Sequence, residues 1–254
     1  MFTLQLRWPV LVLIGLSICG LAKAQTGESF KTGQKVSGSI SLGKEGFFGS
    51  TLRHIPLPDG EWTVLHGESN TSVVQMARVF LAKHEAGKIS ELLIVQANTA
   101  RGSSVRFPDF CVSADVIHQN KYDSTTWNQR CMEIRHDTGI LIQKPGSGNK
   151  IKDGVVSLGL SAEPVMLWAS YVQFDQKGDL LRFEHLVDPS KYEIDTVPSD
   201  YRDSPWHKSK LSGDARRSAF VKQFIDYSES LSDKLQMAFQ FKPASPLPSF
   251  TFKE

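Results

Sequence analysis

The side chains best suited to binding or catalysis lie in and just after the segment between Cys111 and Cys131. This segment carries imidazole, phenol, carboxylate, indole and guanidinium groups, which can hold a polar ligand or transfer protons to a substrate. An irregular loop that is stapled to a rigid scaffold is where binding residues tend to lie. The candidate binding residues are His118, Tyr122, Asp123, Trp127, Arg130 and His136.

A simpler interpretation of the same segment is structural. Trp127 would then pack over the disulfide, and the charged side chains would be solvated. On the sequence alone we favour this structural role, and ligand binding is the alternative. The residue types and their spacing assign no catalytic residue.

Cys111 and Cys131 are predicted to form a disulfide. Cys19 lies in a segment that we expect to be removed, so the remaining two cysteines allow one pairing. Closing this ring would stabilise the fold by about 3 kcal/mol in the chain-entropy model. The alternatives are a redox pair or two metal ligands, but redox pairs usually have C-x-x-C spacing and these cysteines are 20 residues apart.

Residues 1–24 have the order of features that is typical of a secretory signal peptide. Arg7 supplies the positive charge, Val10–Leu16 is an almost unbroken apolar run, and Ala22-Lys23-Ala24 provides small residues for a cleavage site. A membrane anchor is one alternative, but a span needs about 20 apolar residues. A lipid anchor on Cys19 is another. We expect a periplasmic or secreted protein, with no transmembrane segment after cleavage.

Removal of this segment would leave a chain without net charge. The full sequence has 29 Lys and Arg against 27 Asp and Glu, and Arg7 and Lys23 leave with the signal peptide. Nucleic-acid binding draws on a surplus of positive charge. We therefore expect no nucleic-acid partner.

The signatures of common catalytic and metal sites are absent from the sequence. None of the seven histidines forms H-x-H or H-E-x-x-H, and neither G-x-S-x-G nor G-x-x-x-x-G-K-[ST] occurs. We predict no metal and no cofactor, and we lean towards a protein that is not an enzyme.

The hydrophobic pattern predicts an α+β fold, with an antiparallel β-rich core that is either a sandwich or a curved sheet, and a C-terminal helix packed on one face. Alternation predicts a strand at Val36–Leu42, and glycine-containing links predict hairpins at 73–97 and 166–187. The other expected elements are a proline-fixed turn at 55–60, a strand at Glu61–His66 and a strand at Gly154–Leu160.

The chain is expected to end in helices and an extended tail. A Ser-Pro pair at 204–205 is a typical start for a short helix, which Gly213 would interrupt. Asp214 would then open a longer helix through about Phe241, with a possible break at its central serines. Its apolar stripe consists of Phe220, Phe224, Tyr227, Leu231, Leu235 and Phe239. We expect this stripe to pack on the protein's own sheet, with docking of a partner as the alternative.

A second group of aromatic and charged residues, Tyr201, Arg202, Trp206 and His207, lies beside the first helix start. We expect its aromatic side chains to pin the helix to the sheet rather than to form a ligand cage. No break in composition marks a linker. We therefore expect one exported domain at 25–254, with an ordered core at about 36–242 and a proline-containing tail at 243–254.

Four short features are spread over most of the mature chain. They are Leu57–Trp62, the pair Cys111 and Cys131, Gly178–Leu181 and Gly213–Arg216. Together they resemble uncharacterised secreted or periplasmic proteins of proteobacteria. The resemblance implies export and a setting in the bacterial envelope, and it implies no activity and no catalytic residue.

These observations predict a non-enzymatic protein of the cell envelope that binds a small ligand or an envelope partner. One alternative is a hydrolase whose site is built from the disulfide-bounded loop, with His118, Asp123 or His136 in it. Another is an envelope assembly factor that uses exposed apolar surface.

The disulfide can be tested without knowing the function. Thiol-reactive mass tagging of the mature protein should add no tag before reduction and two tags after it, because a bridged sulfur is not a nucleophile. Labelling of both cysteines without a reductant would contradict the bridge.

Overall fold

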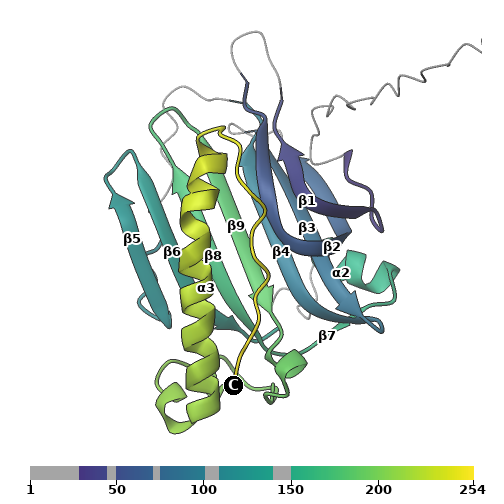
Figure 1. The fold of residues 1–254 in the computed structure, drawn as a ribbon, viewed down its shortest axis with the longest axis vertical. Coiled ribbons are helices and arrows are strands. Elements are labelled where there is room, and N and C mark those ends of the chain that lie inside the picture. Colours follow the sequence, from purple (N-terminus) through teal and green to yellow (C-terminus); the bar gives the residue numbers. More distant parts are fainter. Residues whose placement is uncertain (1–28, 45–49, 71–74, 101–108, 140–149) are drawn as a thin grey trace, which may run out of the picture.

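The computed structural model describes residues 29–44, 50–70, 75–100, 109–139 and 150–254. The predicted signal peptide lies outside these residues. The described strands form one nine-stranded sheet, with the long helix α3 across one face (Figure 1). The shorter helix α2 packs on the opposite face, where it contacts the alternate residues of the same strands. The α+β prediction is confirmed, and a single sheet takes the place of a sandwich.

The strands pair in the order β1-β2-β3-β4-β9-β8-β6-β5, and every pair in this order is antiparallel. The two-residue strand β7 pairs in parallel with β4. The bounds are β1 Lys35–Leu42, β2 Arg53–Asn70, β3 Met76–Glu85, β4 Lys88–Asn98, β5 His118–Ser124, β6 Gln129–Asp137, β7 Ser161–Ala162, β8 Met166–Phe174 and β9 Leu180–Val187.

Both predicted hairpins are confirmed. The β3–β4 turn contains Ala86 and Gly87, whose φ angles are 49° and 79°, and the turn before β9 contains Gly178 at 79°. Glycine takes this left-handed conformation without steric cost, so the glycines of the two links fix the turns.

The expected turn at 55–60 is wrong, because β2 runs through it as one strand of 18 residues. Prolines are tolerated there because β3 begins to pair with β2 only at Thr63, which leaves the first half of β2 paired with β1 alone. The free side of this half is covered by the C-terminal segment, where the Leu247 N–H donates to the Leu57 carbonyl at 3.1 Å.

Helix α3 spans Ala215–Phe239 and confirms the predicted long helix. Asp214 caps it by accepting a hydrogen bond from the Arg217 N–H at 2.9 Å. The helix is unbroken at its serines, since the Ser228 hydroxyl donates to the Phe224 carbonyl within the helix. The apolar stripe is buried against the protein's own sheet, at Phe220, Phe224, Leu231, Leu235 and Phe239.

The expected short helix after Ser204 is wrong. Residues 200–210 form successive tight turns, one of which is closed by the hydrogen bond from the His207 N–H to the Ser204 carbonyl. The short 3₁₀ helix η3, Leu211–Gly213, separates these turns from α3. The tail after Pro243 is extended as predicted and runs along α3 (Figure 1). It is also part of the core, because Leu247 and Phe250 are buried.

The predicted strand at Gly154–Leu160 is also wrong, because Lys150–Ser157 forms helix α2. Its apolar residues suit a strand, but Ile151 and Val155 are one helical turn apart and both pack into the second core cluster. Gly154 lies against the backbone of β2, where a Cβ would be 2.4 Å from the Leu65 carbonyl oxygen. Tertiary contact with β2 therefore outweighs the local preference for a strand.

This close approach predicts the effect of Gly154→Ala. Alanine is the better helix former by about 1 kcal/mol, but its methyl group would push α2 off the sheet. We expect the free energy of unfolding to fall by about 1–3 kcal/mol, as for an overpacked core.

The measurement is denaturant unfolding followed by circular dichroism. Gly213→Ala is the matched control, because a Cβ there meets no atom within 4 Å. A Gly154→Ala variant that is as stable as the wild type would contradict the docking of α2.

Candidate functional site

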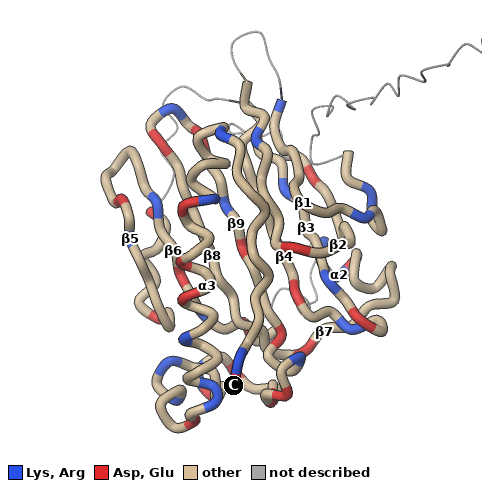
Figure 2. The backbone as a smooth tube through the Cα atoms, viewed as in Figure 1, with Lys and Arg blue, Asp and Glu red and all other residues tan. Residues whose placement is uncertain are grey.

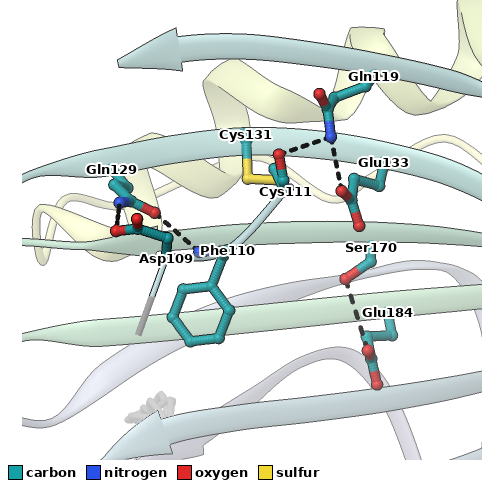
Figure 3. The surroundings of a disulfide bond; sticks show 9 residues. All are labelled: Asp109, Phe110, Cys111, Gln119, Gln129, Cys131, Glu133, Ser170 and Glu184. Carbon is teal, nitrogen blue, oxygen red and sulfur yellow. Dashed lines mark hydrogen bonds between the residues drawn. A yellow bond between two sulfur atoms is a disulfide. The ribbon is translucent and has the colours of Figure 1, made fainter. Parts of the chain in front are cut away.

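The disulfide that bounds the candidate segment lies on the face of the sheet opposite α3. Cys111 precedes β5 and bonds to Cys131 of β6, with the two Cα atoms 6.3 Å apart. Figure 3 shows that Gln119 donates from its amide to the Cys111 carbonyl and to Glu133, both at 2.7 Å. Phe110, rather than Trp127, packs against the disulfide. These contacts make the segment a rigid platform.

Two of the candidate binding residues serve to attach α3 to the sheet edge. His118, Asn120 and Tyr122 point to the same face of β5, and all three contact the carboxylate of Glu229 in α3. Burial first, and then the hydrogen bond to Glu229, raise the pKa of Tyr122 to about 12, so this phenol stays protonated and donates. The Glu229 carboxylate is occupied, which favours a structural role for this cluster.

The remaining candidates do not converge on one place. Trp127 is 50% exposed beside the β5–β6 turn. The Arg130 guanidinium lies over the Tyr122 ring, 4.5 Å from its centre, and borders a cavity together with Asp123. His136 lies at the other end of β6, in the wall of a different cavity.

The cavity at His136 forms where regular pairing of the sheet ends. The pairing of β5 with β6 stops at Ile134, so the last residues of β6 have only β8 beside them among the described strands. The cavity has a volume of about 390 Å³. Its lining residues are Ser113, Asp115, Arg135, His136, Asp137, Trp168 and Tyr201. The disulfide-bounded segment therefore meets the segment that follows β9.

Aromatic stacking builds one wall of this cavity. The Tyr201 ring stacks on the His136 ring at 4.1 Å with an interplanar angle of 12°. His207 meets His136 edge-on at 6.0 Å. On another part of the wall the Arg135 guanidinium lies 3.7 Å from the centre of the Trp168 ring.

Two nitrogen atoms in these walls lack hydrogen bonds. His136 donates from Nε2 to the Tyr201 carbonyl at 2.9 Å, and burial lowers the pKa of its imidazole, so the ring is neutral and its Nδ1 is an acceptor. This Nδ1 is buried without a partner, and so is the Trp168 Nε1–H donor. Each unpaired buried group costs about 1–3 kcal/mol, so two of the residues that line the cavity each carry an unpaired nitrogen, one an acceptor and one a donor.

A histidine near this cavity has the partners of a hydrolase triad by residue type. His207 Nε2 lies 3.1 Å from Asp115 Oδ1, and its Nδ1 lies 2.8 Å from the Ser209 hydroxyl. However, Asp115 is also 3.6 Å from Lys208 Nζ, and Ser209 is exposed and does not line the cavity. The geometry favours a turn that is held together by polar contacts over a nucleophile aimed at a substrate.

The most deeply buried charges form a separate network under α3. The Glu91 carboxylate accepts from His185 Nε2 at 3.0 Å and lies within 3.5 Å of Lys83 and Lys191. The other ring nitrogen of His185 is 3.1 Å from the Tyr227 hydroxyl. None of the described cavities is lined by these residues, so we assign the network to the core.

Among the described residues, no three His, Cys, Asp or Glu side chains are placed to hold a metal ion. None of the described helices has the length and apolarity needed to cross a bilayer. Comparisons with protein-family models, curated proteins and solved structures found no match.

The cavity brings Tyr201 of the second group beside residues of 113–137, from which it is distant in the sequence. Trp206 of the second group is fully buried and packs edge-on against Phe220 of α3, so it anchors the turns before α3 rather than the short helix that we expected. Trp168 was missed as a site residue. Its position directly across from Arg135 in the β6–β8 pair became apparent only when the strand register was known.

The Glu91 network predicts a specific pH dependence of stability. Burial alone would raise the pKa of Glu91, but the hydrogen bond from His185 and the charges of His185, Lys83 and Lys191 outweigh it and lower the pKa from 4.5 to about 2. The ionised carboxylate thus stabilises the fold above pH 4.5, by about 3 kcal/mol. This contribution is lost as the pH falls from about 5 to 2.

Glu91→Gln should therefore lower the free energy of unfolding at pH 7 by about 3 kcal/mol and flatten its dependence on pH between 5 and 2. Urea unfolding at a series of pH values measures both effects, with the exposed Glu85→Gln as control. A variant that keeps the wild-type slope would show that Glu91 does not titrate as described.

Proposed function

We propose that this protein is an exported, non-enzymatic binding protein whose small-molecule ligand occupies the His136 cavity. The observation that carries the proposal is the pair of unpaired buried groups, His136 Nδ1 and Trp168 Nε1, in the wall of one cavity. Buried polar groups are almost always paired in folded proteins. Exceptions mark places where stability is traded for function.

The cavity has the size and lining of a ligand site. Ligand pockets usually enclose about 300–1,000 Å³ and combine aromatic walls with a few placed polar groups. Here the aromatic wall comes from Trp168 and Tyr201, and the polar groups come from His136, Arg135 and Asp137. The ligand should be a small molecule with a flat apolar part, a hydrogen-bond donor and a hydrogen-bond acceptor.

The distribution of charged residues favours a small ligand over a partner that binds to a large area of one charge. Figure 2 shows basic and acidic residues interspersed along the strands and helices of the described chain in this view. Recognition then depends on individual side chains. The α3 stripe is buried against the sheet, so it does not offer the apolar surface that an assembly factor would use.

Export is supported by the predicted signal peptide and by the disulfide, because such bonds persist in oxidising compartments. The alternative of a hydrolase is supported less well. The histidine that contacts a carboxylate and a serine is His207, and that serine is outside the cavity.

The experiment is a thermal-melting screen of residues 25–254 with metabolites, glycans and peptides, followed by titration of each compound that raises the melting temperature. A ligand at 100 times its Kd stabilises the folded state by about 2.7 kcal/mol. Trp168→Phe keeps an aromatic ring but removes the indole donor, and we expect it to weaken binding about tenfold, the effect of one lost hydrogen bond.

Trp127→Phe is the matched control, because Trp127 is half exposed and does not line the cavity. A saturable ligand that loses affinity only in Trp168→Phe would support the site. A ligand bound equally well by both variants, or no stabilising compound in the whole screen, would contradict it.

A further inference from the structure

A second cavity, of about 280 Å³, lies between the β5–β6 hairpin, the end of β8 and helix α3. It shares no lining residue with the His136 cavity. Its wall contains the guanidinium-bearing Arg130, the carboxylate-bearing Asp123 and Asp175, and the amide-bearing Gln173 and Gln236. Such a mixture of both charges in one small cavity restricts what can bind there.

Arg130 is a cation without a counterion among the described residues. Its guanidinium lies 4.5 Å from the centre of the Tyr122 ring, and its NH1 atom is buried without a hydrogen bond. Tyr122 is itself fixed by its contact with Glu229, so the ring is a stable platform under the guanidinium. A planar guanidinium held in this way is suited to a carboxylate, which accepts two parallel hydrogen bonds.

The two aspartates are each oriented through one oxygen. Asp175 Oδ1 accepts from the Lys177 and Asp179 N–H groups at 2.9 and 3.1 Å, and Asp123 Oδ1 accepts from the Thr125 N–H at 3.3 Å. Neither carboxylate forms an ion pair with a described residue, so each keeps an oxygen for a positively charged group. A plain anion would meet repulsion from two carboxylates, and a plain cation would leave Arg130 unpaired.

We propose that this second cavity binds a small zwitterion, such as a free α-amino acid, with its carboxylate on Arg130 and its ammonium group between Asp123 and Asp175. Because Gln173 Oε1 accepts from the Tyr171 hydroxyl at 2.5 Å, the Gln173 amide N–H groups are left to donate. They add donors beside the guanidinium. The cavity volume suits a molecule of amino-acid size. This site is independent of the ligand proposed for the His136 cavity.

The test is isothermal titration calorimetry of residues 25–254 with each of the standard L-amino acids. Propionate and ethylamine serve as half-ligands, since each carries one of the two charges. We expect at least one amino acid to bind saturably with one site, and both half-ligands to bind at least about tenfold more weakly, since each loses one charged contact.

Variants then locate the binding. Arg130→Lys keeps the charge but loses the two-pronged geometry, and Asp123→Asn removes one negative charge. Each should weaken binding about tenfold. The matched control is Arg202→Lys, because Arg202 is exposed and lies outside the cavity.

Three outcomes would overturn the proposal. The first is that no amino acid binds, and the second is that propionate binds as tightly as the best amino acid, which would show a simple anion site. The third is that Arg130→Lys and Arg202→Lys bind alike, which would place the ligand elsewhere. Circular dichroism of each variant confirms that the fold is retained.

Discussion

The buried carboxylate of Glu91 is the constraint on which the packing of this protein depends. It lies on β4 at the centre of the sheet and is only 2% exposed. Through His185 it is linked to β9 and, one hydrogen bond further, to Tyr227 of α3. Lys83 adds β3, and Lys191 adds the 3₁₀ helix η2, Pro189–Tyr192. A charge at such depth is tolerated only when it is paired, so the segments must come together around it.

The cavities, by contrast, lie where this order ends. The centre of the sheet is paired on both sides and filled by apolar side chains. At the β5–β6 edge the pairing stops early, the disulfide fixes an irregular segment, and the turn after β8 and the loop after β9 approach. An irregular edge segment that is linked to a rigid sheet by a disulfide can hold polar side chains in fixed positions and leave space between them. Both proposed sites follow from this margin.

The elements that the sequence predicted well are those decided by local signals. The hairpins depend on Gly87 and Gly178, and α3 depends on its apolar spacing and the Asp214 cap. The errors occur where distant contacts decide. Helix α2 forms because Gly154 fits against β2, and the prolines of β2 are accommodated because the C-terminal segment replaces a strand beside them.

The same distinction holds for the candidate sites. The sequence identified the disulfide pair and both polar groups. It could not show that Asp115 and Tyr201 line the same cavity, because no local sequence signal indicates which distant segments come together. It also treated His118, Tyr122, Arg130 and His136 as one cluster. The structure spreads them along the β5–β6 hairpin instead. His118 and Tyr122 contact Glu229 of α3, Tyr122 and Arg130 border the second cavity, and His136 borders the first.

The position of Phe250 has a consequence for how the chain matures. It packs among Phe220, Phe224 and Tyr227, and Leu247 covers the unpaired side of β2. Both residues are synthesised after every described strand and after α3, so the main apolar layer cannot close before Leu247 and Phe250 have emerged. Until then the apolar layer stays exposed, and exposed apolar surface makes a partly folded chain prone to aggregation.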